Sequence, residues 1–255
     1  MTVNGYLSDA DYDRLEKAYP ELFGPCVTCQ GTGNYIWKGA THDCDCKQQR
    51  HLGTRYAHAG IGLTYQRLTW DDLEVPDNQL APVRNYVENV ESYVACGMGL
   101  FLSGSVGSGK TLIANLVLKD LVRRGYDCYF TTFAGAVEHF TSGWGDNDEK
   151  KRFANRFMRS RVLCLDDLGK EFRASNGLSP TTFDYILRTR VFEGRPTILT
   201  TNLTAAEVKT GYGASVLSLL VEKSIEVPLS GADFRVKAHS RSIAEIKANK
   251  MRPIQ

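Results

Sequence analysis

The 255-residue sequence predicts an α/β fold in which a parallel β-sheet is flanked by helices, preceded by a small cysteine-rich unit. Three observations support this prediction. From Gly97 onward, short apolar segments alternate with amphipathic helical segments, which is the pattern of a parallel sheet with crossover helices. A glycine-rich loop separates the first such strand from the first such helix. Four of the seven cysteines lie together within the first 50 residues.

The chain is expected to divide into four parts. A short helix at Ser8–Tyr19 precedes the cysteines, and a helix at Ala81–Val94 is expected in the connector between the small unit and the sheet. The sequence does not contain internal repeats. The four expected parts are a cysteine-rich domain at 1–50, a linker at 51–95, the sheet domain at 96–240 and a basic C-terminal tail at 241–255.

Each element of the sheet domain follows from its local pattern. Apolar and β-branched runs predict strands, and the amphipathic run that ends at Gly125 predicts a helix. The expected elements are strands at Leu100–Ser103, Cys128–Thr132, Val162–Leu165, Thr197–Thr201 and Glu226–Leu229, and a helix at Thr111–Arg124.

Charge and hydropathy narrow the class of protein. With 31 Lys and Arg against 29 Asp and Glu, the formal net charge is +2, so no global field marks a nucleic-acid binder. Basic residues do cluster at 150–161 and 237–252, where they form either solvated helix faces or phosphate-contacting surfaces. No apolar run approaches the roughly 20 residues that span a bilayer, and the N-terminus lacks a signal-peptide pattern. We therefore expect a cytoplasmic protein with free cysteines and no membrane partner.

The glycine-rich loop matches the phosphate-binding pattern G-x-x-x-x-G-K-[ST] in full. Glycines let the backbone turn its N–H groups toward a phosphate, and the helix N-terminus that follows adds partial positive charge. Lys110 is expected to reach the β- and γ-phosphates, and the Thr111 hydroxyl is expected to bind Mg²⁺. The sequence therefore predicts an ATP and Mg²⁺ site formed by Gly104, Ser105, Val106, Gly107, Ser108, Gly109, Lys110 and Thr111.

Polar residues follow two of the predicted strands. Asp166 and Asp167 come after Val162–Leu165, and Asn202 follows Thr197–Thr201. Strand ends of a parallel sheet meet at one edge, so Asp166 is expected to hold Mg²⁺ through water and Asp167 to orient the attacking water. Asn202 is expected to hydrogen-bond the γ-phosphate and that water. The alternatives are surface acids in a turn and an Asn that caps a turn.

The cysteine cluster has the spacing of a structural zinc site. Cys26-x-x-Cys29 and Cys44-x-Cys46 are separated by 14 residues, which suits two pairs of thiolates joined by a hairpin. His42 is an alternative ligand, and Tyr35 and Trp37 are expected to cover the site. Free or redox-active thiols are the other interpretation. The expected zinc ligands are Cys26, Cys29, Cys44 and Cys46.

Four motifs in order resemble the DnaC/DnaI-type replicative helicase loaders, the AAA+ branch that also contains the IstB transposition ATPases. The motifs lie within residues 60–240 and are Gly99–Thr111, Leu163–Gly169, Thr200–Asn202 and Gly231–Arg235. The resemblance implies an AAA+ P-loop NTPase fold and ATP hydrolysis. It also implies self-assembly on a hexameric DnaB-type helicase and delivery of that helicase to single-stranded DNA.

The resemblance also implies roles for individual residues. Asp166 matches the metal-binding acid, and Asp167 occupies the position that is Glu in most AAA+ enzymes. Asn202 matches sensor 1. Arg235 matches sensor 2, which contacts the γ-phosphate of its own subunit's nucleotide, although an arginine here also suits a surface ion pair.

One position departs from the family pattern. Relatives carry an arginine finger where this chain reads Ser218–Glu222, with Leu219 at the finger position. A leucine cannot stabilise transition-state charge, an effect worth about 10³–10⁵ in rate, and Lys223 nearby is a poor geometric substitute. The sequence therefore predicts weak hydrolysis by the isolated protein.

The remaining partners are expected by resemblance. DnaI-like and several phage loaders have an N-terminal zinc module that binds the helicase, and direct nucleic-acid binding is the competing interpretation for this one. Phe140, Phe172 and Arg173 are candidates for contacts with single-stranded DNA. Two other functions remain open, an IstB-like transposition-targeting ATPase that binds duplex DNA and a nucleotide-gated adaptor with little hydrolysis.

Overall fold

The computed structural model describes most of the chain from Cys26 onward. The expected helix at Ser8–Tyr19 lies outside the described residues, apart from Lys17. The described residues are 17, 26, 28–142, 147–170, 178–231, 233–234, 240, 243–244, 247 and 252–255.

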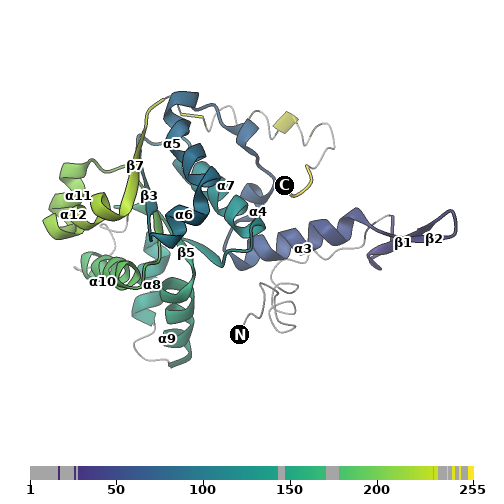
Figure 1. Cartoon of the computed structure of the whole chain (residues 1–255), viewed down its shortest axis with the longest axis horizontal. Helices are drawn as coiled ribbons and strands as arrows, with labels where there is room; N and C mark the ends of the chain where they lie inside the picture. Colours follow the sequence, from purple (N-terminus) through teal and green to yellow (C-terminus); the bar gives the residue numbers. More distant parts are fainter. Residues whose placement is uncertain are drawn as a thin grey trace.

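A five-stranded parallel sheet forms the centre of the body (Figure 1), as the α/β pattern predicted. Its order is β4-β5-β6-β3-β7, and every neighbouring pair is parallel. Nearly all side chains of β5 and β6 are buried, because helices cover both faces of the sheet. The strands are β3 (Gly99–Gly104), β4 (Cys128–Thr132), β5 (Val162–Leu168), β6 (Thr197–Thr201) and β7 (Ser224–Leu229).

Two apolar clusters, one on each face of the sheet, form the core. Leu100 and Leu102 of β3 point into the first cluster, and Phe101 points into the second, as strand alternation requires. The first cluster packs helices α5 (Asp77–Glu88), α6 (Val90–Ala95) and α7 (Lys110–Arg123) against the sheet. The second packs α8 (Phe133–Ser142), α10 (Leu178–Phe192), α11 (Ala205–Tyr212) and α12 (Ala214–Lys223), with α9 (Asn147–Phe153) and a π-helical turn at Ala154–Arg159 beside them.

The predicted strands at Cys128–Thr132 and Thr197–Thr201 have the observed bounds, and the helical spacing at Ala81–Val94 falls on helices but not on one continuous helix. The chain there forms two helices, α5 and α6, which meet at Asn89 with φ −106° and ψ 27°. Apolar residues on both sides of the break are buried in one cluster. The helical spacing therefore continues across the break and does not reveal it.

A β-hairpin projects from the body at the far end of a long helix (Figure 1). The hairpin consists of β1 (Asn34–Trp37) and β2 (Ala40–Asp43), whose residues are all exposed, and helix α3 (Asp45–His58) follows it. Tyr56 at the inner end of α3 is fully buried in the first cluster. The expected domain boundary at residue 50 therefore falls inside a continuous helix that joins the cysteine-rich unit to the body.

A short connector leads from α3 to α5, and residues 252–255 pack against it. The connector contains α4 (Leu63–Gln66) and a 3₁₀ turn at Trp70–Asp72. Arg252 pairs with Asp72 at 2.7 Å, and Ile254 is buried in the first cluster. This end of the expected basic tail is thus part of the packed body.

Among the described residues, no helix combines the length and the apolar character that crossing a membrane would require.

A buried arginine ties one end of the sheet together. The Arg190 side chain on α10 is fully buried. Its Nη1 donates to the carbonyls of Phe157 (2.8 Å) and Ser160 (3.1 Å), its Nη2 donates to Pro196 O (2.8 Å), and its Nε donates to the Thr197 hydroxyl (3.0 Å). One guanidinium therefore satisfies several buried oxygens just before β5 and β6.

We predict that Arg190→Leu lowers the free energy of unfolding by about 3 kcal/mol or more, because it leaves buried carbonyls without a donor. The matched control is Arg188→Leu on the same helix, where an exposed ion pair with Asp184 is worth less than about 1 kcal/mol. Urea unfolding of the two variants measures both values. Equal losses would contradict the assigned role of Arg190.

Candidate functional site

The glycine-rich loop connects β3 to α7 in a conformation that requires its glycines. Gly107 and Gly109 have φ values of 80° and 89°. A Cβ on Gly104 would lie 1.9 Å from the carbonyl oxygen of Leu229. The Lys110 ammonium lies within the loop, donating to Gly104 O (2.9 Å) and Ser105 O (2.7 Å). The loop thus concentrates backbone N–H groups, a helix N-terminus and a cation, the donor set that binds phosphates.

An acid from β5 meets the first turn of α7. The Thr111 hydroxyl lies 3.0 and 3.2 Å from the two carboxylate oxygens of Asp166, which is only 4% exposed. Burial raises the pKa of Asp166, while hydrogen bonds from Thr200 and Thr111 oppose that rise. A carboxylate beside a hydroxyl offers the hard oxygen ligands that Mg²⁺ prefers, so these residues fit the expected ion.

Two of the three expected catalytic residues, Asp167 and Asn202, lie at the same edge of the sheet. Asp167 directly follows Asp166 and is half-buried, and its carboxylate lies 2.6 Å from the Lys170 ammonium. Asn202 comes directly after β6, the neighbour of β5, and is also half-buried. Because both strands are parallel, the fold brings Asp166, Asp167 and Asn202 to one edge.

The segment that carries Arg235 lies against the glycine-rich loop. The Phe234 N–H donates to Gly107 O at 3.2 Å, and a Cβ on Gly107 would lie 2.1 Å from Oδ1 of Asp233. Arg235 itself lies outside the described residues. Sequence reasoning singled out the arginine and missed Asp233, although both belong to the same short motif.

The connector supplies an apolar wall that sequence reasoning also missed. Side chains of Leu73 and Val75 would each lie 3.5 Å from a Cβ at Gly109, so they stand against the loop where α7 begins. No motif marks these residues, because only the tertiary fold brings the connector to the loop.

The residue at the finger position and one of the expected DNA-contact residues pack against apolar or aromatic side chains, and the other two lie outside the described residues. Leu219 on α12 is half-buried against the second apolar cluster, and Lys223 pairs with Glu222 at 2.9 Å. Phe140 packs against Phe153 and Tyr185 rather than standing open. Phe172 and Arg173 lie outside the described residues.

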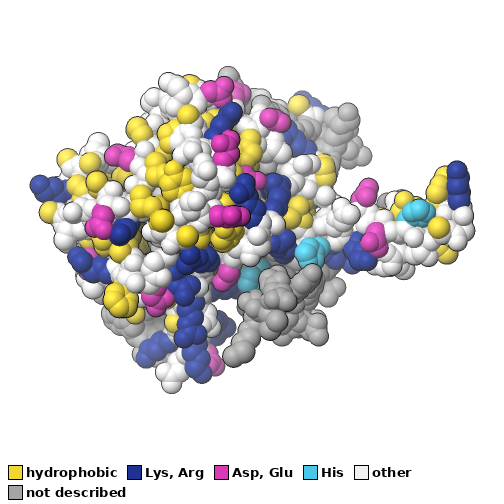
Figure 2. Space-filling view, in the orientation of Figure 1, with side chains coloured by type: hydrophobic (Ala, Val, Ile, Leu, Met, Phe, Trp, Pro, Cys, Tyr) yellow, Lys and Arg dark blue, Asp and Glu magenta, His cyan; other side chains and the backbone are white. Residues whose placement is uncertain are grey.

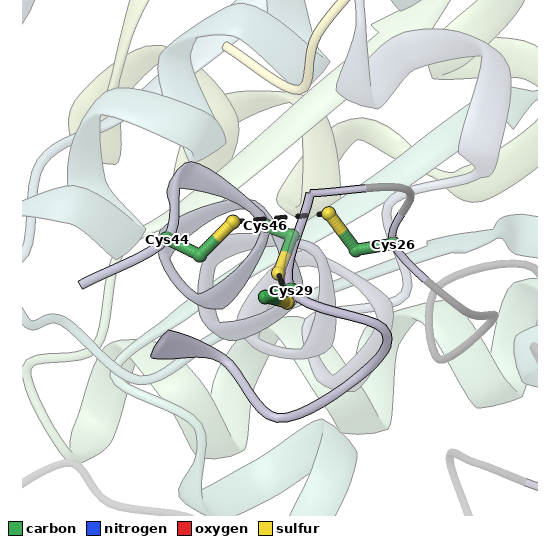
Figure 3. A group of neighbouring side chains, drawn as sticks. All are labelled: Cys26, Cys29, Cys44 and Cys46. Atoms are coloured by element: carbon green, nitrogen blue, oxygen red, sulfur yellow. Dashed lines mark hydrogen bonds between the residues drawn. The ribbon is translucent and has the colours of Figure 1, made fainter. Parts of the chain in front are cut away.

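The four expected cysteines form one compact group at the base of the hairpin (Figure 3). Their sulfur atoms all lie within 4.8 Å of one another. Cys26 Sγ is 3.7 Å from Cys44 Sγ, and Cys29 Sγ is 3.3 Å from Cys46 Sγ. Four convergent thiols, two of them buried, are a donor set for a tetrahedrally coordinated soft metal ion.

The aromatic residues of the hairpin do not belong to this donor group. His42 is exposed and stacks on Tyr35, with ring centroids 5.6 Å apart, so it does not join the four cysteines. Trp37 is 61% exposed, and the expectation that it covers the cluster is wrong. The hairpin strands run outward from the cysteines, which leaves the Trp37 ring in solvent.

The cysteine thiols differ in acidity. At Cys29, burial raises the pKa, but hydrogen bonds from Cys46 and from the Gly33 N–H outweigh burial and lower the pKa to about 6. At Cys46, the hydrogen bond to Cys29 is the largest of the effects that raise the pKa to about 12. Metal ions bind the thiolate, so the lowered pKa favours the ligating form of Cys29 at neutral pH.

The parallel sheet, the phosphate-binding loop and the acid on β5 define the class: this is a P-loop protein with an α/β fold. Within that class, the chain belongs to the family of IstB-like ATP-binding proteins, whose family model matches residues 76–242. The family match includes the glycine-rich loop, both acids, Asn202 and Arg235.

The individual relatives include a replicative helicase loader and ATP-binding proteins of insertion sequences. The chain is 25% identical over 166 residues to the replicative helicase loader DnaI of Bacillus subtilis, covering 64% of this chain and 51% of that protein. It is 30% identical over 145 residues to an ATP-binding protein of insertion sequence IS5376 from Geobacillus stearothermophilus, covering 54% and 55%. The chain thus spans only about half the length of these relatives.

A solved structure supports the fold. The crystal structure of the DnaC helicase loader matches 66% of this chain and all of that chain, with a TM-score of 0.60 and 24% identity.

We predict that Gly107→Ala lowers the free energy of unfolding by about 3 kcal/mol, because the new methyl group adds a clash with Asp233 to the strain of a positive φ. Gly125→Ala is the control, since Gly125 has φ 90° but open space around its Cβ position. That variant should lose only about 1 kcal/mol. Chemical denaturation compares the two. If both lose the same amount, Asp233 does not pack on the loop.

Proposed function

We propose that this protein is an ATP-dependent helicase loader, which delivers a hexameric DnaB-type helicase to single-stranded DNA. One observation carries the proposal. Helix α3 joins a four-cysteine hairpin to an AAA+ body of the IstB-like family. The similarity to DnaI supports the same assignment.

In the proposed mechanism, the backbone N–H groups of Gly104–Thr111 and the Lys110 ammonium bind the β- and γ-phosphates. Thr111 and Asp166 would hold Mg²⁺, which neutralises charge on the phosphates when bound. Asp167 accepts a hydrogen bond from the attacking water and aligns it, and Asn202 donates to the γ-phosphate. Arg235, in the segment that follows Phe234, contacts the same phosphate.

Hydrolysis is proposed to be slow because the position of the expected finger carries a hydrocarbon side chain. Leu219 is packed against the apolar cluster of its own subunit, so it offers no charge to a neighbour. The groups that bind ground-state ATP are present, whereas a cation for the transition state is missing at this position. ATP binding, rather than ATP hydrolysis, would then determine the conformational state of the loader.

We predict that Lys110→Ala abolishes ATP binding and that Asp167→Asn preserves binding while stopping hydrolysis. The lysine contacts bound phosphates, whereas the aspartate acts on water. Turnover of the unmodified protein alone should stay below about 1 s⁻¹, the low end of ordinary enzyme rates. Binding of a fluorescent ATP analogue and phosphate release measure the two steps separately. Wild-type affinity in the Lys110 variant would refute the assignment of the nucleotide site.

The cysteine-rich hairpin is proposed to hold one zinc ion and to bind the helicase. Ile36 is 76% exposed and Trp37 is 61% exposed, at the end of a module that projects from the body (Figure 1). Exposed aromatic and large apolar side chains are typical of residues that dominate protein interfaces. Zinc fits because four thiolates favour a tetrahedral soft ion and a small hairpin needs a stabilising centre.

Single-stranded DNA is proposed to bind near α9. Lys150, Lys151 and Arg152 are exposed there, and basic side chains gather at this end of the molecule (Figure 2). Phosphate contacts of this kind make affinity strongly salt-dependent. Phe140 is held in an aromatic cluster and is less suited to stack on a base.

We predict that native mass spectrometry finds one zinc per chain and a complex with the cognate helicase. Cys29→Ser should lose both the zinc ion and the helicase complex, because the loss of one thiolate ligand weakens binding of the ion that stabilises the hairpin. Cys96→Ser removes an exposed cysteine outside the cluster and should keep both. A Cys29 variant that binds the helicase normally would refute the role of the module, and a chain without zinc would refute the metal.

Two relatives of this family are named for insertion sequences, which keeps transposition targeting as a second candidate function. In that case the protein would assemble on duplex DNA with ATP and bind a transposase. Leu219 also favours a third candidate, a nucleotide-gated adaptor that binds a protein partner, hydrolyses little ATP and loads no helicase. Filaments on duplex DNA would support the second candidate. ATP binding without capture of the replicative helicase and without such filaments would support the third.

A further inference from the structure

The two acids of the site lie on an irregularity in the sheet. Along the β5–β6 pair, Leu165 lies opposite Leu199 and Leu168 lies opposite Thr201. Two residues of β5, Asp166 and Asp167, therefore face the single residue between them on β6, which is Thr200. This is a β-bulge, a feature that re-aims side chains and is frequent beside active sites.

The Thr200 hydroxyl connects both bulged residues. It donates to Asp166 Oδ1 at 2.6 Å and accepts from the Asp167 N–H at 2.9 Å. A hydroxyl has one donor and two acceptor positions, so it makes both bonds at once. Thr200 is fully buried, so solvent is excluded from the hydroxyl.

The backbone of Asp167 depends on such support. Its φ is +60°, a left-handed conformation that a residue with a Cβ rarely adopts. The bulge also takes its N–H out of the regular ladder between β5 and β6. The Thr200 hydroxyl replaces that lost backbone partner, which favours the left-handed conformation over a regular strand.

The neighbouring threonines do not make the same pair of hydrogen bonds as Thr200. Thr111 also bonds Asp166, but from α7, and it makes no bond to the backbone of Asp167. The next residue, Thr201, donates to Leu168 O at 2.7 Å and holds the far end of the bulge. Thr200 is the residue that joins the carboxylate of one acid to the backbone of the other.

We propose that Thr200 is a positioning residue for ATP hydrolysis, whose hydroxyl fixes the metal-binding acid and the water-orienting acid relative to each other. This inference rests on the proposed nucleotide site. Thr200 itself is not proposed to contact the substrate.

Three variants of the full chain test the inference. Thr200→Val keeps the shape and removes the hydroxyl, and Thr200→Ser keeps the hydroxyl. Thr197→Val is the matched control, because Thr197 is on the same strand and its buried hydroxyl accepts from Arg190, away from the acids. Thr200→Ala serves as a second hydroxyl-free variant if the valine variant does not fold.

The expected result is a loss in kcat of about 10–100-fold for Thr200→Val, the size seen when residues supporting a metal ligand are removed. The KM for ATP should change less than about 3-fold, since Lys110 and the loop bind the phosphates. Hydrogen exchange of the Asp167 amide should become faster. Thr200→Ser should restore kcat and exchange, and Thr197→Val should reduce stability without changing either.

Unchanged kcat in Thr200→Val, an equal loss in Thr197→Val, or no rescue by serine would overturn the inference. The amide exchange separates this failure from failure of the proposed function. If the unmodified protein never hydrolyses ATP, the proposed catalysis fails, and exchange at Asp167 still decides whether the Thr200 hydroxyl holds the two acids. Protection that is the same with valine as with threonine would overturn the inference in either case.

Discussion

The hydrogen bond between Thr111 and Asp166 is the contact on which the arrangement of the site depends. It joins the first turn of α7 to the end of β5, although β6 lies between β5 and β3 in the sheet. The bond forms because all three strands are parallel and end at one edge. β6 therefore also reaches the junction, and it contributes Thr200 within the strand and Asn202 just beyond it. A single acid is thus oriented by a helix and by a neighbouring strand, with little room for an alternative position.

Segments far apart in the chain meet around this junction. Leu73 and Val75 of the connector lie against Gly109, and Phe234 bonds the backbone of Gly107. Downstream, residues 252–255 pack on α3 and on the connector, and the Gln255 N–H donates to Gln66 O at 3.1 Å. The helix that carries the cysteine hairpin is therefore held by a chain segment that comes after Gly231–Arg235. This packing gives the hairpin and the glycine-rich loop a common support in the first apolar cluster, which is the physical link that a nucleotide-dependent loader needs.

Local signals predicted the strands, the glycine-rich loop and the cysteine group, because each depends on a few consecutive residues. The spacing of Cys26, Cys29, Cys44 and Cys46 was enough to predict a compact group joined by a hairpin. The break at Asn89 was missed, since buried residues continue at helical spacing through it. The role of Thr200 could not be predicted, because it depends on a two-against-one register between β5 and β6. Asp233, Leu73 and Val75 were missed for the same reason: only long-range packing brings them to the loop.

Leu219 connects the geometry of the site to the proposed role. Binding energy that is equal in the ground state and the transition state tightens nucleotide binding without accelerating hydrolysis. In the proposed site the loop, Lys110 and Thr111 would supply such binding, whereas Leu219 would supply no transition-state charge. A protein built this way would spend most of its time with ATP bound and its assembly fixed. Hydrolysis would then wait until another component of the complex brings a cation to the γ-phosphate. For the proposed loader this would be a useful order of events, because the helicase would stay attached until the assembly on DNA is complete.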